Sequence, residues 1–236
     1  MKNLQNMTRF LLAGLLLVTI SGMVSQAQAS VGLGATRVIY PGGSKQVQLP
    51  VTNNDEKKTF LIQSWIENGE GKKDGRFVIT PPLFSMKGKK ENTLRIIDAT
   101  NNQLPKDRES LFWLNVKAIP SMDKEQANKS QNTLQLAIVS RIKLYYRPAN
   151  LELAPEHAAE KLTFSRAGSS LTLNNPTPYY LTVTELSAGG RPLENALVPP
   201  FGSASVKIPS DAGNEIKFRT INDFGALTDP MKILIR

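Results

Sequence analysis

Short runs of alternating apolar and polar residues, separated by turn residues, extend along most of the chain. In the run QVQLPVT, Val47, Leu49 and Val51 fall two apart and therefore share one face of an extended strand. No stretch sustains the period of an amphipathic helix. Turn residues rich in glycine and proline recur at short intervals between the runs, which is typical of an all-β sandwich.

The runs fall into two groups, one on each side of the segment Pro148-Ala149-Asn150. The first group predicts about seven strands, at residues 37–40, 46–52, 59–65, 76–80, 92–97, 111–119 and in a long run from 133. The second group predicts strands at residues 161–165, 170–173, 179–185, 204–208, 215–220 and 232–235. We therefore expect two β-sandwich domains, covering residues 30–149 and 150–236.

The run LQLAIVSRIKLYYRP, residues 134–148, is the most informative segment of the chain. Leu134, Leu136 and Ile138 lie on one face of the predicted strand, and we call them the donor row; Lys143 lies on the opposite face. Such a long apolar strand can belong to the core of its own sheet, or it can be lent to a protein that lacks a strand. Periodicity alone favours the first interpretation.

The opposite face of the same run carries Ala137, Val139 and Tyr145. This face is apolar enough to serve the protein's own core, so we expect it to be the buried one. The donor row would then be left exposed for a partner.

The first 29 residues have the composition of a secretory signal peptide. Lys2 and Arg9 form a basic start, an apolar segment follows at residues 10–20, and Ala27-Gln28-Ala29 fits a cleavage site. The apolar segment is short for a membrane span of about 20 residues, so an uncleaved anchor is the weaker alternative. We expect an exported protein without stable membrane insertion.

Composition narrows the chemistry that this protein can perform. The chain has no cysteine, which excludes thiol catalysis, cysteine metal sites and disulfides. The net charge is +9, and it becomes +7 when the two basic residues of the signal peptide are removed. A basic surface favours an acidic partner, but export argues against nucleic acid.

No constellation of catalytic residues is present. The only histidine, His157, lies in the segment EHAAE, which predicts a short surface turn near the domain junction. The sequence has no HExxH, GxSxG, P-loop or GxGxxG motif. We therefore expect no enzyme, no metal and no cofactor, and the alternatives to a binding protein are an exported hydrolase or a structural subunit.

Several segments resemble the periplasmic pilus chaperones. Residues 104–121, LPKDRESLFWLNVKAIPS, match the signature segment of that family at Glu109, Phe112, Trp113, Asn115, Ile119 and Pro120. The other similar segments are GATRVIYP at 34–41, SRIKLYYRP at 140–148, NPTPYYLT at 175–182 and INDFG at 221–225. Phe224 stands where the family pattern has tyrosine. The matches span the mature chain and are most similar to the chaperones of type 1 fimbriae, in the subclass with a short loop at 117–133.

The resemblance implies two immunoglobulin-like sandwiches in an L-shaped (boomerang) arrangement. It also implies a periplasmic chaperone whose clients are fimbrial (pilin) subunits, including a tip adhesin, each an immunoglobulin-like domain without its last strand. The chaperone binds, folds and caps the subunit by donor-strand complementation and delivers it to an outer-membrane usher for fimbria assembly. Self-association of the free chaperone stays open.

The resemblance also implies roles for individual residues. Arg37 and Lys143, which we call the cation pair, should bind the C-terminal carboxylate of the subunit. The donor row should supply the strand that the subunit lacks. An ionic cluster of Glu109, Arg147 and Asp223 should connect the two domains and set the angle between them.

Overall fold

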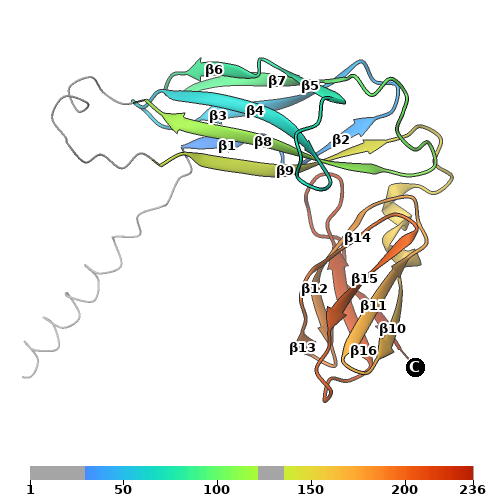
Figure 1. The fold of residues 1–236 in the computed structure, drawn as a ribbon. Helices are drawn as coiled ribbons and strands as arrows, with labels where there is room; N and C mark the ends of the chain where they lie inside the picture. The colour runs from blue at the N-terminus through green and yellow to red at the C-terminus, as the bar shows by residue number, and fades with distance from the viewer. Residues whose placement is uncertain (1–29, 122–135, 236) are drawn as a thin grey trace, which may run out of the picture. The chain divides into compact units, whose positions relative to one another are not determined.

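The computed structural model describes residues 30–121 and 136–235, which form two β-sandwiches (Figure 1). The strands of the first sandwich are β1 (Val31–Leu33), β2 (Arg37–Pro41), β3 (Gln46–Asn53), β4 (Phe60–Asn68), β5 (Phe77–Thr80), β6 (Leu83–Met86), β7 (Lys90–Asp98), β8 (Ser110–Pro120) and β9 (Ile138–Arg147). Its two sheets have the strand orders β1-β3-β7-β5 and β2-β9-β8-β4-β6. The predicted all-β architecture is confirmed.

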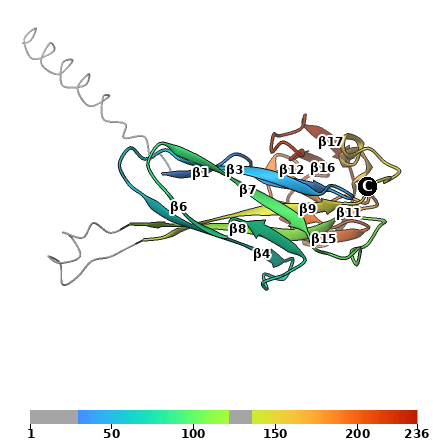
Figure 2. The same cartoon turned by 90° about the horizontal axis from the view of Figure 1, so that it is seen from above.

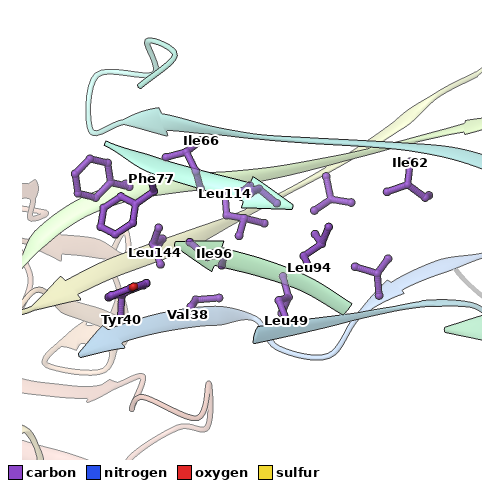
Figure 3. Packing of buried hydrophobic residues seen from close by; sticks show 14 of the residues in the cluster. Val38, Tyr40, Leu49, Ile62, Ile66, Phe77, Leu94, Ile96, Leu114 and Leu144 are labelled. Carbon is purple, nitrogen blue, oxygen red and sulfur yellow. The ribbon is translucent and has the colours of Figure 1, made fainter. Parts of the chain in front are cut away.

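The core of the first sandwich lies between these two sheets (Figure 3). Alternation along each strand directs the apolar side chains there: in β4, Phe60, Ile62 and Ile66 are buried, whereas Leu61 is exposed. The neighbouring strands contribute Val38, Tyr40, Leu49, Phe77, Leu94, Ile96, Leu114 and Leu144. Because burial of each such side chain contributes about 1.5–3 kcal/mol, packing can stabilise this domain without disulfides.

Strand β9 is only partly covered by the facing sheet. Leu144 is fully buried in the core, and Ile142 and Tyr146 pack at its margin. Ile138 lies an even number of residues before them, on the same face of the strand, but it is 64% exposed. The core-facing side of β9 therefore continues outward as an exposed apolar surface.

The expectation that Ala137, Val139 and Tyr145 serve the core is wrong. Ala137 and Val139 are exposed, and Tyr145 is buried outside the core cluster of the first sandwich. Alternation along the run defines two faces of the strand, but the sequence does not show which of them the second sheet covers.

Strands β2 and β9 pair in parallel, with Arg37 opposite Lys143 and Pro41 opposite Arg147. On its other side, β9 pairs with β8 from Ile138 to Tyr146, and the two strands run side by side in both views (Figures 1 and 2). Among the residues that the structure describes, residues 138–142 of β9 therefore pair on one side only. This leaves an open strand edge that ends at Lys143.

The strands of the second sandwich are β10 (Thr163–Ala167), β11 (Ser170–Asn175), β12 (Leu181–Ala188), β13 (Arg191–Pro192), β14 (Ala196–Val198), β15 (Gly202–Lys207), β16 (Glu215–Thr220) and β17 (Met231–Leu234). One sheet has the order β10-β11-β15, and the other has the order β13-β12-β16-β17, with β14 also paired to β12. Its core includes Leu171, Leu173, Val183, Ile216 and Phe218.

Two short 3₁₀ helices, η1 (Pro155–His157) and η2 (Ala159–Lys161), precede the second sandwich. His157 is exposed within them, and its Nδ1 lies 3.5 Å from Glu160 Oε1. The expectation of a surface turn at His157 is confirmed.

The structure differs from the predicted strands mainly in short elements. The sequence analysis missed β1, β6, β13 and β14, which are two to four residues long and too short to show alternation. The predicted long strand starts at 133, whereas β9 begins at Ile138. Leu134 and most of the predicted loop lie outside the described residues.

A pair of substitutions on one face of β9 tests this architecture. We expect Leu144→Ala to lower the free energy of unfolding by about 2–5 kcal/mol, because it leaves a cavity in a closed core. Ile138→Ala should change it by less than about 0.5 kcal/mol, because that side chain is already exposed. Urea unfolding of both variants measures the difference, and equal losses would contradict the partial coverage of β9.

Candidate functional site

The cation pair lies where the parallel strands β2 and β9 begin to pair. Because Arg37 is in register with Lys143, the two side chains leave neighbouring strands from the same face of the sheet. Both reach groups of the second sandwich: Arg37 Nη1 donates to the Ile221 carbonyl at 3.1 Å, and Lys143 Nζ donates to Thr182 Oγ1 at 3.1 Å. The site is therefore built from both sandwiches.

The cation pair carries two positive charges without local compensation. Within the described chain, neither Arg37 nor Lys143 has a carboxylate at ion-pair distance. Burial lowers the pKa of Lys143, and the positive charge of Arg37 lowers it further. Two partly buried cations that repel each other form a site with a strong preference for an anion.

Two polar atoms at this site lack hydrogen-bond partners among the described residues. They are Nε of Arg37 and the hydroxyl oxygen of Tyr145, both of which are buried. A buried donor without a partner costs about 1–3 kcal/mol, so such groups mark a strained or functional place.

The loop at residues 221–225 of the second sandwich approaches the first sandwich closely. Gly225 has φ 83°, and a Cβ atom there would lie 2.2 Å from Thr36 Oγ1. Only glycine permits both this backbone conformation and this contact. The side chain of Asn222 stabilises the loop by accepting hydrogen bonds from the Phe224 and Ala226 amides at 3.1 and 3.0 Å.

The structure brings Glu109, Arg147 and Asp223 into contact, as the ionic cluster requires. Arg147 Nε donates to Glu109 Oε1 at 2.8 Å, and its Nη1 and Nη2 donate to the two Asp223 oxygens at 2.6 and 2.7 Å. The planar fork of arginine suits this arrangement. The guanidinium also lies over the Tyr179 ring, 5.0 Å from its centroid. The side chain of Arg147, on β9, thus connects Glu109, the residue before β8, with the second sandwich.

Glu109 is the most deeply buried member of the cluster. Its residue is 3% exposed, and its second oxygen accepts a hydrogen bond from the Tyr180 amide at 2.8 Å. Its own amide donates to the Pro178 carbonyl at 2.9 Å. Burial raises the pKa of Glu109, although Arg147 and the Tyr180 amide partly offset the effect. For Arg147, burial opposes the charge, but Asp223 and Glu109 outweigh it and raise its pKa.

The described part of the donor row is exposed. Leu136 is 70% exposed and Ile138 is 64% exposed, and Leu136 precedes the first residue of β9. Leu134 lies outside the described residues. Exposed neighbouring apolar side chains beside an open strand edge indicate a protein-binding surface.

Sequence reasoning missed several groups that line the cation pair. The alternation of the run predicts Tyr145 in the core, and nothing in the sequence points to the Ile221 carbonyl or to Thr182. The parity of Tyr145 with Lys143 could have placed their side chains on one face. A backbone carbonyl has no sequence signal, so its contact with Arg37 needed the structure.

Other kinds of site find no support in the described ranges, 30–121 and 136–235. No group of three or more histidine, cysteine, aspartate or glutamate side chains there is arranged to hold a metal ion. None of the helices there has the length and apolarity to cross a membrane.

Comparison with known proteins defines the class. Residues 30–152 match the family model of the pili and flagellar-assembly chaperone PapD N-terminal domain, and residues 157–231 match that of the pili assembly chaperone PapD C-terminal domain. The chain therefore belongs to the family of pilus assembly chaperones, which are not enzymes.

Among individual relatives, the chaperone protein FimC of Escherichia coli K12 is 70% identical over 227 residues, covering 96% of this chain and 93% of FimC. The chaperone protein FocC of Escherichia coli is 65% identical over 214 residues, covering 90% of this chain and 93% of FocC. The crystal structure of the periplasmic chaperone SfaE has a TM-score of 0.78 at 64% identity and covers 87% of this chain and 100% of SfaE. A chain from the complex of the Salmonella enterica SafA pilin with the SafB chaperone has a TM-score of 0.80 at 32% identity, covering 88% of this chain and 97% of that chain.

The ionic cluster gives a stability prediction. We expect Arg147→Ala to lower the free energy of unfolding by about 3–5 kcal/mol, because it leaves the buried Glu109 without its cation. Arg191→Ala, which breaks the exposed pair with Asp211, is the control and should cost about 0–1 kcal/mol. Thermal unfolding and small-angle scattering measure the effect, and unchanged curves for Arg147→Ala would contradict the proposed connection.

Proposed function

We propose that this protein is a periplasmic chaperone that binds, folds and caps fimbrial subunits by donor-strand complementation. The observation that carries the proposal is the open edge of β9, which ends at the cation pair. An incomplete subunit exposes apolar surface and lacks a strand, so the open edge of β9 could complete it.

The cation pair would set the direction of an added strand, because only a strand parallel to β9 would end there. Strand β9 runs from Ile138 towards Lys143, and β2 takes up the pairing at Arg37 and continues in the same direction. A subunit strand paired in parallel with residues 138–142 would lie on the same side of β9 as β2, in line with it, and would end where β2 begins. Its C-terminal carboxylate would then lie at the cation pair.

Binding of the subunit's C-terminal carboxylate by the cation pair, which we call the anchor, explains how one chaperone serves different subunits. Every subunit ends in a carboxylate, whatever its sequence, and charge-assisted hydrogen bonds from Arg37 and Lys143 contribute about 1.5–3 kcal/mol each. Pinning the last residue also fixes the register of the added strand, since a shift by one residue would turn its apolar side chains to the other face.

The donor row would fill the apolar gap of the subunit. Leu136 and Ile138 are exposed in the free chaperone, so their burial in a subunit is gained only on binding. Main-chain pairing along the open edge adds affinity without a sequence requirement. The same edge would pair two copies of the free chaperone, which makes self-association a competing state.

Location and delivery complete the proposal. The signal-like segment at residues 1–29 supports export to the periplasm, with domain limits at 30–149 and 150–236. The relatives include probable fimbrial chaperones, and one structural neighbour is complexed with a pilin. We propose that the clients include a tip adhesin and that an outer-membrane usher receives them. The L-shaped arrangement of the two sandwiches, set by the ionic cluster, stays a prediction.

The anchor is tested with two peptides that copy the last strand of a fimbrial subunit, one with a free carboxylate and one with a C-terminal amide. We expect Arg37→Ala and Lys143→Ala each to weaken binding of the free-carboxylate peptide by roughly tenfold or more, with thermal stability retained. Isothermal titration calorimetry gives the affinities. Equal binding of the amidated and free peptides to the unaltered chaperone would exclude the anchor.

The lowered pKa of Lys143 predicts the pH dependence of binding. A bound carboxylate favours the ammonium form, so the pKa of Lys143 is higher in the complex than in the free chaperone. Affinity is therefore full below the pKa of the free state and falls as the pH rises towards the pKa of the complex. Lys143→Arg, which stays charged, should flatten this alkaline decline, and an identical decline in both proteins would assign the titration to another group.

The donor row is tested by Leu136→Glu. This variant should keep its melting temperature, because the side chain is 70% exposed, and should fail to co-purify a co-expressed fimbrial subunit. Lys117→Glu, on the opposite face of the neighbouring strand, is the control for an added negative charge. A large loss of stability in isolated Leu136→Glu would place Leu136 in the core and refute the donor role.

A further inference from the structure

The hydroxyl of Tyr145 is buried beside the cation pair and has no hydrogen-bond partner among the described residues. The residue is 2% exposed, and its ring stacks on that of Tyr180 with centroids 5.5 Å apart. Stacking holds the ring in place but provides no hydrogen bond to the hydroxyl. A buried hydroxyl without a partner destabilises the free protein, so its presence calls for a role in the bound state.

The position of Tyr145 on the sheet connects it with the anchor. Lys143, Tyr145 and Arg147 alternate along one face of β9, so Tyr145 lies between the cation pair and the ionic cluster. Burial raises the pKa of Tyr145 to about 12, while a contact with the Thr182 side chain, outside ordinary hydrogen-bond geometry, and the positive charge of Arg37 lower it. Both influences require the hydroxyl to lie close to the groups that contact the cation pair. The phenol stays protonated at neutral pH and can donate.

The donors around the cation pair are only partly used in the free protein. Arg37 Nη1 is bonded to the Ile221 carbonyl, and Lys143 uses one of its three N–H groups on Thr182. The remaining N–H groups of Lys143 are unused, and Arg37 Nε and the Tyr145 hydroxyl are unpaired but closed to solvent, so a carboxylate reaches these two only when the side chains that cover them move. A carboxylate offers about four acceptor positions, which is enough for all three residues.

We propose that Tyr145 donates its hydroxyl hydrogen to the C-terminal carboxylate of the subunit, as the third ligand beside Arg37 and Lys143. This inference rests on the proposed anchor and adds a neutral donor to it. The neutral donor supplies a directed hydrogen bond without increasing the repulsion between the two cations. It also explains why an unpaired hydroxyl is tolerated at this depth, because the subunit satisfies it.

The test uses Tyr145→Phe and the same two peptides, with a free or an amidated C-terminus. We expect the variant to bind the free-carboxylate peptide about tenfold more weakly and to bind the amidated peptide as the unaltered chaperone does. Its melting temperature should be unchanged or higher, because the substitution removes an unsatisfied group and keeps the ring. Tyr146→Phe, on the opposite face of β9, is the matched control and should leave both affinities unchanged.

The outcomes separate the two proposals. If Tyr145→Phe weakens both peptides equally, or neither, while amidation and Arg37→Ala still weaken binding, the anchor stands and the third ligand is refuted. If amidation and Arg37→Ala have no effect, the anchor itself fails. The proposed role of Tyr145 is supported if only the free-carboxylate peptide binds more weakly and the melting temperature does not fall. A purely structural role would lower the melting temperature and the affinity for both peptides.

Discussion

The parallel pairing of β2 with β9 is the constraint on which the other features depend. Its register puts Arg37 beside Lys143, and its first paired residue leaves the preceding part of β9 open on one edge. If β2 extended further towards its N-terminal side, the edge would be closed and the cations would lie within a finished sheet. The site therefore results from a strand, β2, that begins to pair only at Arg37.

The loop at residues 221–225 makes this site a property of both sandwiches. The Ile221 carbonyl accepts from Arg37, Asp223 pairs with Arg147, and Gly225 lies against Thr36. The same short segment thus holds the arginine of the cation pair and the arginine of the ionic cluster. A displacement of the loop at its contact with Arg37 would also displace its contact with Arg147, because a closely packed loop transmits such shifts.

Strand β9 serves different purposes on its two faces and along its length. One face starts as exposed apolar surface at Ile138 and becomes core at Leu144, while the other carries Lys143, Tyr145 and Arg147 towards the second sandwich. This division explains why the free protein contains features that destabilise it. Exposed apolar side chains and an open edge lie along β9, and the unpaired donors lie on β9 and the neighbouring β2, where one client could satisfy them together.

The sequence by itself determined the all-β class and the position of most strands, because alternation is a local property of the chain. It also provided Arg37, Lys143 and the ionic cluster, through their resemblance to family motifs, and the structure brings the three cluster residues together. Only the tertiary structure decided which face of β9 is core, because alternation does not identify the covering sheet. It also decided the place of Tyr145 and the contact between Arg37 and Ile221, which are 184 residues apart. Such contacts depend on the folding of both sandwiches and on backbone groups that every residue shares, so no local pattern records them.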